Sequence, residues 1–244
     1  MYTYRVECLL DRLLSSRRRY TRFGIGPFEA GHANIVATNL RKGLLNGVPG
    51  WSANGASLKG VSHEFTTIPG VKESSLEIII NLRELVLTGA PPIKTNSEEI
   101  ATLTETGPKV VTAKDLNLPK HIKVVDPNQE IATLGRNGSL EALVKLDYQT
   151  RNENFSLNQR SFSPQNISNF MSLGCTAFPV KRVSYIIRVE PHPVTKREVE
   201  YIFLEILSDN SLHPKRALII ATQHIIDLLW PIGGRRLRPH TNYI

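Results

Sequence analysis

The residues able to do acid–base or metal chemistry are scattered along this chain of 244 residues. Two-metal catalysis needs carboxylates held close together around the ions. No two aspartates lie within three positions of each other; they are Asp11, Asp115, Asp126, Asp147, Asp209 and Asp227. The phosphate-binding Gly-Lys-Ser/Thr loop and the Gly-x-Ser-x-Gly nucleophile motif do not occur in the sequence either. We therefore predict no catalytic residues, no metal site and no cofactor.

Two smaller signals are open to both a chemical and a structural interpretation. His63 and Glu64 form only the start of a His-Glu-x-x-His zinc motif, so we favour a structural role for them. Cys8 and Cys175 are the two cysteines, too few for a zinc site on their own. We expect free thiols in a reducing compartment rather than a disulfide.

The positive charge is concentrated at the two ends of the chain. Residues 1–22 contain six arginines and two acids, and residues 231–244 contain three arginines and no acid, so the ends account for most of the net charge of +8. The body is nearly neutral, which fits a protein-binding platform with peripheral affinity for nucleic acid or an acidic partner. Solvated, mobile ends are an equally good interpretation. No run approaches the roughly 18 apolar residues of a membrane helix, so we expect no membrane contact.

Two segments with helical periodicity dominate the pattern. In residues 32–46, the apolar residues Val36, Leu40 and Leu44 recur every four positions, and Gly47 follows as a C-cap. Residues 214–230 begin with Pro214, which suits the first position of a helix. This second segment is apolar around so much of its circumference that it must be buried on two sides. One side could pack on the chain's own sheet and the other on a second copy; burial within a single core is the alternative.

The remaining pattern predicts mostly strands. Residues 1–30 alternate as extended chain, with residues 9–14 ambiguous between strand and helical turn. A further helix is expected over residues 73–82, with Leu76, Ile79 and Ile80 on its buried side. Residues 149–172 are polar and predict a long loop that contacts a partner. The other expected strands cover residues 56–58, 61–67, 84–88, 100–104, 121–125, 130–134, 140–148, 180–190 and 198–207.

Several stretches together resemble a known family. They read GPFEAG at residues 26–31, LRKGLL at 40–45, HEFTTIPGVKE at 63–73, LEIIINL at 76–82 and FLEILSDNSLHPKRAL at 203–218. In order and spacing they are similar to the amino-terminal domain of the RNA polymerase alpha subunit of bacteria and plastids. The resemblance covers roughly residues 20–230, and the stretch beginning at His63 is its most specific part.

The resemblance implies an α+β fold, a sheet carrying two dimerisation helices plus an inserted strand-rich subdomain. Residues 1–50 and 176–230 would form the discontinuous dimerisation subdomain and residues 51–175 the insertion. Residues 231–244 would be a basic tail, touching DNA only indirectly or weakly, and the family's carboxy-terminal DNA-binding domain is expected to be absent. The dimer interface implied by the two helices would contain Val36, Leu40, Leu44, Leu218, Ala221, Ile225 and Leu229.

The resemblance also implies partners: a second copy of the chain, and the large beta and beta-prime subunits. Arg41, Lys42 and Leu45 match the family's contact with the beta subunit, although Lys42 stands where bacterial members usually carry arginine. Without the resemblance, these would be residues of an ordinary solvated helix face. The implied contact with beta-prime matches Arg83, Leu173, Phe178 and Lys181, where the alternative is a cation at a helix C-terminus beside an ordinary strand.

The resemblance implies a non-catalytic alpha subunit of DNA-directed RNA polymerase that dimerises and scaffolds assembly for DNA-templated transcription. Residues 36–42 read VATNLRK, whereas family members usually read LGNALRR in this helix. This divergence favours a plastid-encoded subunit of the chloroplast stroma, with the bacterial cytoplasm as the alternative location. The alternative function is a free-standing basic nucleic-acid-binding protein that uses its Arg-rich ends.

Overall fold

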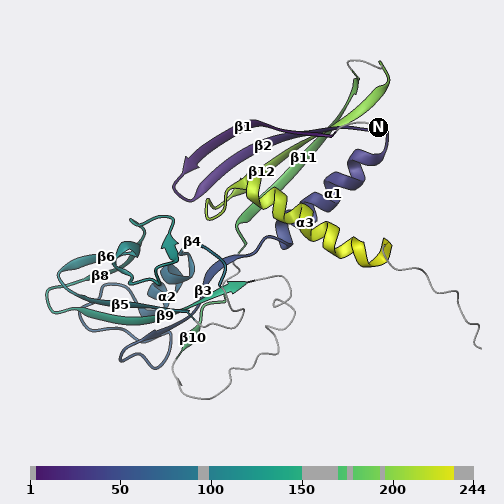
Figure 1. Ribbon diagram of the computed structural model, residues 1–244. Coiled ribbons are helices and arrows are strands. Elements are labelled where there is room, and N and C mark those ends of the chain that lie inside the picture. Colours follow the sequence, from purple (N-terminus) through teal and green to yellow (C-terminus); the bar gives the residue numbers. More distant parts are fainter. Residues whose placement is uncertain (1–3, 93–98, 150–169, 175–177, 193–195, 234–244) are drawn as a thin grey trace, which may run out of the picture.

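The computed structural model describes residues 4–92, 99–149, 170–174, 178–192 and 196–233. Most of the predicted 149–172 loop, Cys175 and most of the basic tail lie outside the described residues. The fold is α+β, as the sequence predicts, and is built mainly from antiparallel sheets (Figure 1). Two separate clusters of buried apolar side chains lie in it, one under each of two sheets.

The first sheet brings the two ends of the chain together. It has four antiparallel strands in the order β1-β2-β12-β11. Alternate residues of the central strands, such as Phe23, Ile202 and Leu204, are buried under the helices, as expected for a sheet with one covered face. The segment at residues 9–14 is strand and not helical turn. The bounds are β1 Arg5–Ser15, β2 Arg18–Phe28, β11 Val180–Pro191 and β12 Glu198–Ser208.

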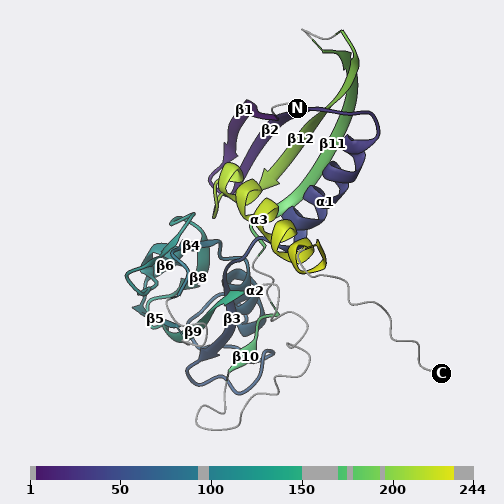
Figure 2. The same ribbon diagram turned by 45° about the vertical axis from the view of Figure 1, so that its right-hand side comes forward.

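Helices α1 (His32–Asn46) and α3 (Pro214–Gly233) cover one face of this sheet (Figures 1 and 2). The start of α1 is fixed by a residue that the sequence pattern does not reveal. Both carboxylate oxygens of Glu200 accept bonds from the backbone, at 2.9 Å from Gly31 N and 3.1 Å from Ala33 N. A carboxylate satisfies the unpaired N–H groups of a helix start and suits its positive dipole end. The helix therefore begins where β12 supplies this side chain.

The second sheet contains strands β5-β9-β3-β4-β7 in that order, with the short β10 paired to β3. A separate pair, β6 and β8, lies against helix α2 and its neighbours. The bounds are β3 Gly50–Leu58, α2 Ser75–Arg83, β4 Leu87–Gly89, β5 Glu99–Thr106, β6 Lys109–Thr112, the 3-10 turn η1 Ala113–Asp115, β7 Ile122–Val124, β8 Glu130–Leu134, β9 Ser139–Gln149 and β10 Met171–Ser172.

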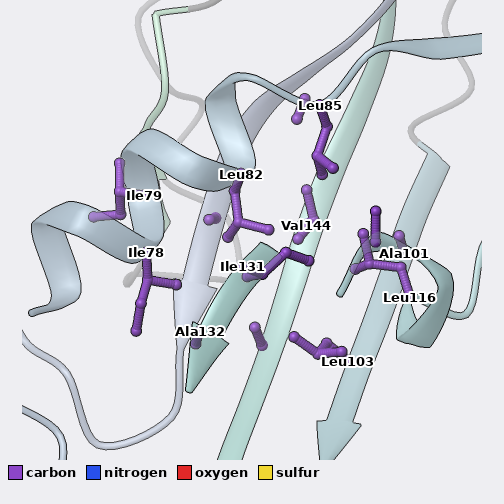
Figure 3. Packing of buried hydrophobic residues seen from close by; sticks show 14 of the residues in the cluster. Ile78, Ile79, Leu82, Leu85, Ala101, Leu103, Leu116, Ile131, Ala132 and Val144 are labelled. Carbon is purple, nitrogen blue, oxygen red and sulfur yellow. The ribbon is translucent and has the colours of Figure 1, made fainter. Parts of the chain in front are cut away.

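Helix α2 closes this second core (Figure 3). It begins with a capping box, in which Ser74 Oγ accepts from Glu77 N at 3.3 Å and Glu77 Oε2 accepts from Ser74 N at 2.7 Å. Such a box satisfies two of the unpaired donors at a helix start. Ile78, Ile79 and Leu82 point into the core. The helix is thus held both at its start and along one face.

Some sequence-based expectations for this region are wrong. The buried face of α2 is formed by Ile78, Ile79 and Leu82, whereas Ile80 is exposed and Leu76 is half-buried. In an isoleucine run the pattern cannot tell which side faces the sheet. Residues 61–67 form turns, because Ser75 N and Ser75 Oγ both bond the carbonyl of Thr66 and fold the segment back on α2. The strand β6 was not predicted, and β4 is shorter than the expected residues 84–88.

Candidate functional site

The charged side chains of the described residues form structural ion pairs rather than a catalytic cluster. Asp11 accepts from Arg19 Nε at 2.9 Å and from Thr21 Oγ1 at 2.9 Å, which ties β1 to β2. The bond from Arg19 is the main cause that lowers the pKa of Asp11 to about 2. Arg22 similarly bonds Glu205 and lowers the pKa of that carboxyl. Among the described residues, no group of three or more histidine, cysteine or acidic side chains is close enough to hold a metal ion.

The part of the chain that the structure describes contains no helix long and apolar enough to cross a membrane. His63, the residue that suggested an incomplete zinc motif, lies in an exposed turn. Its Nδ1 is 3.2 Å from Thr66 Oγ1. This contact joins the two ends of one turn, which is a structural role.

Most of the residues predicted to face a second copy are already buried within one chain. Helices α1 and α3 pack on each other, and Leu40, Leu44, Leu218 and Ala221 are at most 7% exposed. Val36 and Ile225 are half-buried against the same cluster. Of the predicted set, Leu229 alone has a largely exposed side chain, at 53%. Leu40, Leu44, Leu218 and Ala221 therefore offer a second copy little surface, whereas Val36 and Ile225 remain partly exposed.

The two helices approach closely because glycines lie at their crossing. A Cβ on Gly43 would stand 3.2 Å from both the Ala221 carbonyl oxygen and Ile225 Cδ1. A Cβ on Gly47 would stand 2.9 Å from His224 Cδ2. The missing side chains therefore allow α3 to lie directly against the last turns of α1.

A second apolar face of α3 is exposed. Ile219, Ile226 and Trp230 are separated by seven and four residues, so they share one face of the helix, with Leu229 beside them. We call these four residues the α3 stripe; their exposures are 60%, 49%, 73% and 53% in the order Ile219, Ile226, Trp230, Leu229. Ile35 on α1 is also 62% exposed. Large exposed apolar surfaces of this kind mark interaction sites.

The predicted beta-contact residues lie at the end of α1. Arg41 and Lys42 are exposed, whereas Leu45 is half-buried and packs against the core under the first sheet. The exposed part of this site is therefore a pair of adjacent cations, and the leucine mainly supports it.

Two of the predicted beta-prime residues come together in a cleft. Arg83, at the end of α2, and Lys181, at the start of β11, both line a cleft of about 870 Å³ between the two sheets. Leu173 is 3% exposed and belongs to the core under the second sheet. Phe178 is half-buried and is not among the residues that line the cleft. Arg17 and Arg18 line the same cleft, although the sequence offered no reason to group them with Arg83.

Comparison with known proteins agrees with this architecture. Residues 54–166, which include most of the second sheet, match the family described as RNA polymerase Rpb3/RpoA insert domain. The DNA-directed RNA polymerase subunit alpha of a Synechococcus strain is 32% identical over 230 residues, covering 94% of this chain and 72% of the relative. That of Cyanidium caldarium is 34% identical, covering 93% and 70%. That of Guillardia theta is 32% identical, covering 100% and 74%.

The chain belongs to the family of DNA-directed RNA polymerase alpha subunits. It is therefore a non-catalytic subunit that assembles into the polymerase complex and acts in DNA-templated transcription. The resemblance found in the sequence is confirmed.

Proposed function

We propose that this alpha subunit forms a homodimer through the α3 stripe and that the dimer holds the beta and beta-prime subunits together. The observation that carries the proposal is the exposure of the α3 stripe beside a helix face that is already buried. Burying one large apolar side chain stabilises an assembly by roughly 1.5–3 kcal/mol. Burying four such residues therefore favours self-association, and Ile35 on α1 adds a further exposed apolar side chain.

A two-fold symmetric dimer suits this surface. In such a dimer the same patch faces itself, so a self-complementary apolar helix face needs no second kind of surface. Trp230, the most exposed member of the stripe, would then insert against the partner's stripe. The interface is accordingly revised to Ile35, Ile219, Ile226, Leu229 and Trp230, with Val36 and Ile225 at its margin. Leu40, Leu44, Leu218 and Ala221 support it from within each chain.

The contacts that we propose with the large subunits involve two polar surfaces. Arg41 and Lys42 are exposed at the end of α1, and we assign them to the beta subunit, with Leu45 behind them. We assign the surface of Arg83 and Lys181 to beta-prime, with Phe178 at its edge and Leu173 supporting it from the core. Clustered cations at an interface select acidic partner surfaces and orient their approach.

We propose that the chain is divided into two structural units. Residues 1–50 and 176–230 would form the dimerisation unit, and residues 51–175 the inserted unit. The separate apolar clusters under the two sheets support this division, as does the family match to an insert domain. We also propose location in a plastid, with the bacterial cytoplasm as the alternative, since the similar subunits come from algae as well as from bacteria.

The test is co-purification from cells that express an affinity-tagged copy, an untagged copy, beta and beta-prime. We expect the tagged copy to recover the untagged copy and both large subunits. The double variant R41E/K42E should still recover the untagged copy but lose beta by about tenfold or more, because reversed charges repel the partner surface. The matched control is K120E/K123E, which alters two exposed lysines around β7 and should retain beta. Loss of beta from both variants, or from neither, would contradict the assignment.

A further inference from the structure

The cleft between the two sheets has a composition that suits a particular kind of ligand. Four cations line it: Arg17 from the β1–β2 turn, Arg18 from the start of β2, Arg83 from the end of α2, and Lys181 from β11. The acidic side chains in its lining are Glu84 and Asp209. Cations therefore exceed acids by two, and the surface favours a negatively charged occupant.

The cations differ in how far they are already neutralised. Lys181 Nζ lies 3.3 Å from Asp209 Oδ2, and Arg17 Nε lies 3.7 Å from Asp126 Oδ2. Arg18 is exposed and makes no ion pair with any residue in the described part of the chain. Arg18 is thus the cation whose charge is most available to an incoming ligand.

Apolar side chains form part of the cleft lining. Leu14 is 59% exposed at the rim, and Leu85, Leu87 and Leu207 lie in the lining. This mixture fits a polypeptide that alternates apolar and acidic side chains better than it fits a small inorganic anion. A volume near 870 Å³ lies within the range of about 300–1,000 Å³ found for ligand pockets.

Two hydroxyl groups in the lining have unused hydrogen-bonding capacity. Ser52 and Ser208 are 5% and 1% exposed, and neither Oγ has a hydrogen-bond partner in the described structure. Leaving a buried hydroxyl without a partner costs about 1–3 kcal/mol. Both hydroxyls are buried behind the surface of the cleft, so they belong to its packed wall.

The cleft is also bounded by polar contacts between the two sheets. Thr88 Oγ1 donates to the Ser211 carbonyl at 2.7 Å, and Ser16 Oγ donates to Asp126 Oδ2 at 3.0 Å. Thr88 and Asp126 belong to the part of the chain around the second sheet, and Ser16 and Ser211 adjoin the first. A segment bound in the cleft would therefore contact both parts of the subunit at once.

We propose that this cleft receives an extended, acidic segment of the beta-prime subunit that carries at least one apolar side chain. The inference rests on the proposed function, because Arg83 and Lys181 are the residues assigned to beta-prime. It adds the chemistry of the partner segment and the participation of the β1–β2 turn. The carboxylates of the segment pair with Arg18 and Arg83, and its apolar side chain packs against Leu14 and Leu207.

Site-specific photo-crosslinking in the assembled complex tests this inference. A benzoyl-phenylalanine is placed at Leu14, which lines the cleft, or at Leu13, which does not. The two are adjacent and similarly exposed, at 59% and 63%, so they form a matched pair. We expect Leu14, and not Leu13, to crosslink to a beta-prime peptide rich in aspartate or glutamate. Crosslinks from both positions to the same peptide, or from Leu14 to a basic or uncharged segment, would overturn the inference.

A charge series separates this inference from the proposed function. We expect R18E to reduce recovery of beta-prime by about tenfold or more, while R18K retains most of it and homodimerisation is unchanged. The control R136E alters an exposed arginine in the β8–β9 turn and should have no effect.

If the unaltered chain recovers beta-prime and R18E does too, the cleft inference is wrong and the scaffold proposal stands. If the unaltered chain recovers no beta-prime, both fail. A crosslink from Leu14 to nucleic acid would show that the cleft binds nucleic acid and not an acidic polypeptide, and would overturn the inference.

Discussion

At the scale of single residues, Asp11 shows how charge holds the edge of the first sheet. Its carboxylate accepts bonds from Arg19 and Thr21 on the neighbouring strand, and His213 Nε2 lies 3.7 Å away at the start of α3. One side chain therefore links the two strands at the amino-terminal end to the last helix. The bond from Arg19 is the largest of the effects that lower the pKa of Asp11 to about 2.

We expect this carboxylate to make stability depend on pH. An unfolded aspartate has a pKa of about 3.9, so the lowered folded pKa stabilises the fold above that value, and the stabilisation is lost as the pH falls through about 2. At pH 7 the variant D11N should lower the free energy of unfolding by about 1 kcal/mol, a value reduced for partial exposure of the pair.

Urea unfolding at a fixed protein concentration measures this effect. The difference between D11N and the unaltered protein should shrink as the pH is lowered from about 4 towards 2. The control E7Q changes an acid on the same strand and should leave the pH dependence intact. A constant difference at every pH would show that Asp11 acts by packing rather than by charge.

At the scale of elements, the sequence predicted the helices well and their buried faces less well. The expected helix at residues 32–46 is α1, and the last helix begins at Pro214 as expected. Periodicity can show that a segment is amphipathic, but α3 is apolar on two faces. The face with Leu218 and Ala221 is the one buried in the core of the same chain. Which face of α3 is buried depends on where small residues let α1 approach. This depends on both helices together and cannot be read from either segment alone.

The same limit applies to sites built from distant segments. Arg17 and Arg18 lie about 65 positions before Arg83 in the sequence, and no local pattern connects them. The β1–β2 turn reaches the cleft because β2 pairs with β12 in the centre of the sheet. Likewise, Glu200 could be recognised as the cap of α1 only once its strand had been placed beside Gly31.

We predict that a methyl group at Gly47 disrupts the close packing at the end of α1, both within this helix and against α3. A Cβ there would lie 2.6 Å from the Gly43 carbonyl oxygen and 2.9 Å from His224 Cδ2. Forcing such an overlap typically costs about 1–3 kcal/mol, so G47A should lower the midpoint of thermal unfolding. G55A is the matched control, because its Cβ would meet its nearest neighbour at an ordinary 3.5 Å. Equal stability of the two variants would contradict the close packing around Gly47.

At the scale of the whole molecule, the two sheets carry different exposed surfaces. The first carries the helices α1 and α3, with the exposed α3 stripe, and the second carries α2 and the end of the cleft at Arg83. The family membership that the sequence indicated is confirmed by relatives about 30% identical over nearly the whole chain. The sequence of residues 63–73 is characteristic enough to identify the family, although the strand predicted over residues 61–67 was wrong.

The mass of the protein in solution, measured by light scattering at two concentrations, tests the central claim most directly. We predict a dimer, near twice the chain mass of 27.3 kDa. W230E should raise the dissociation constant by at least about 30-fold, whereas F65E should leave the dimer intact, although Phe65 and Trp230 are both 73% exposed. A folded monomer at both concentrations, or equal dissociation by both variants, would contradict self-association through the α3 stripe.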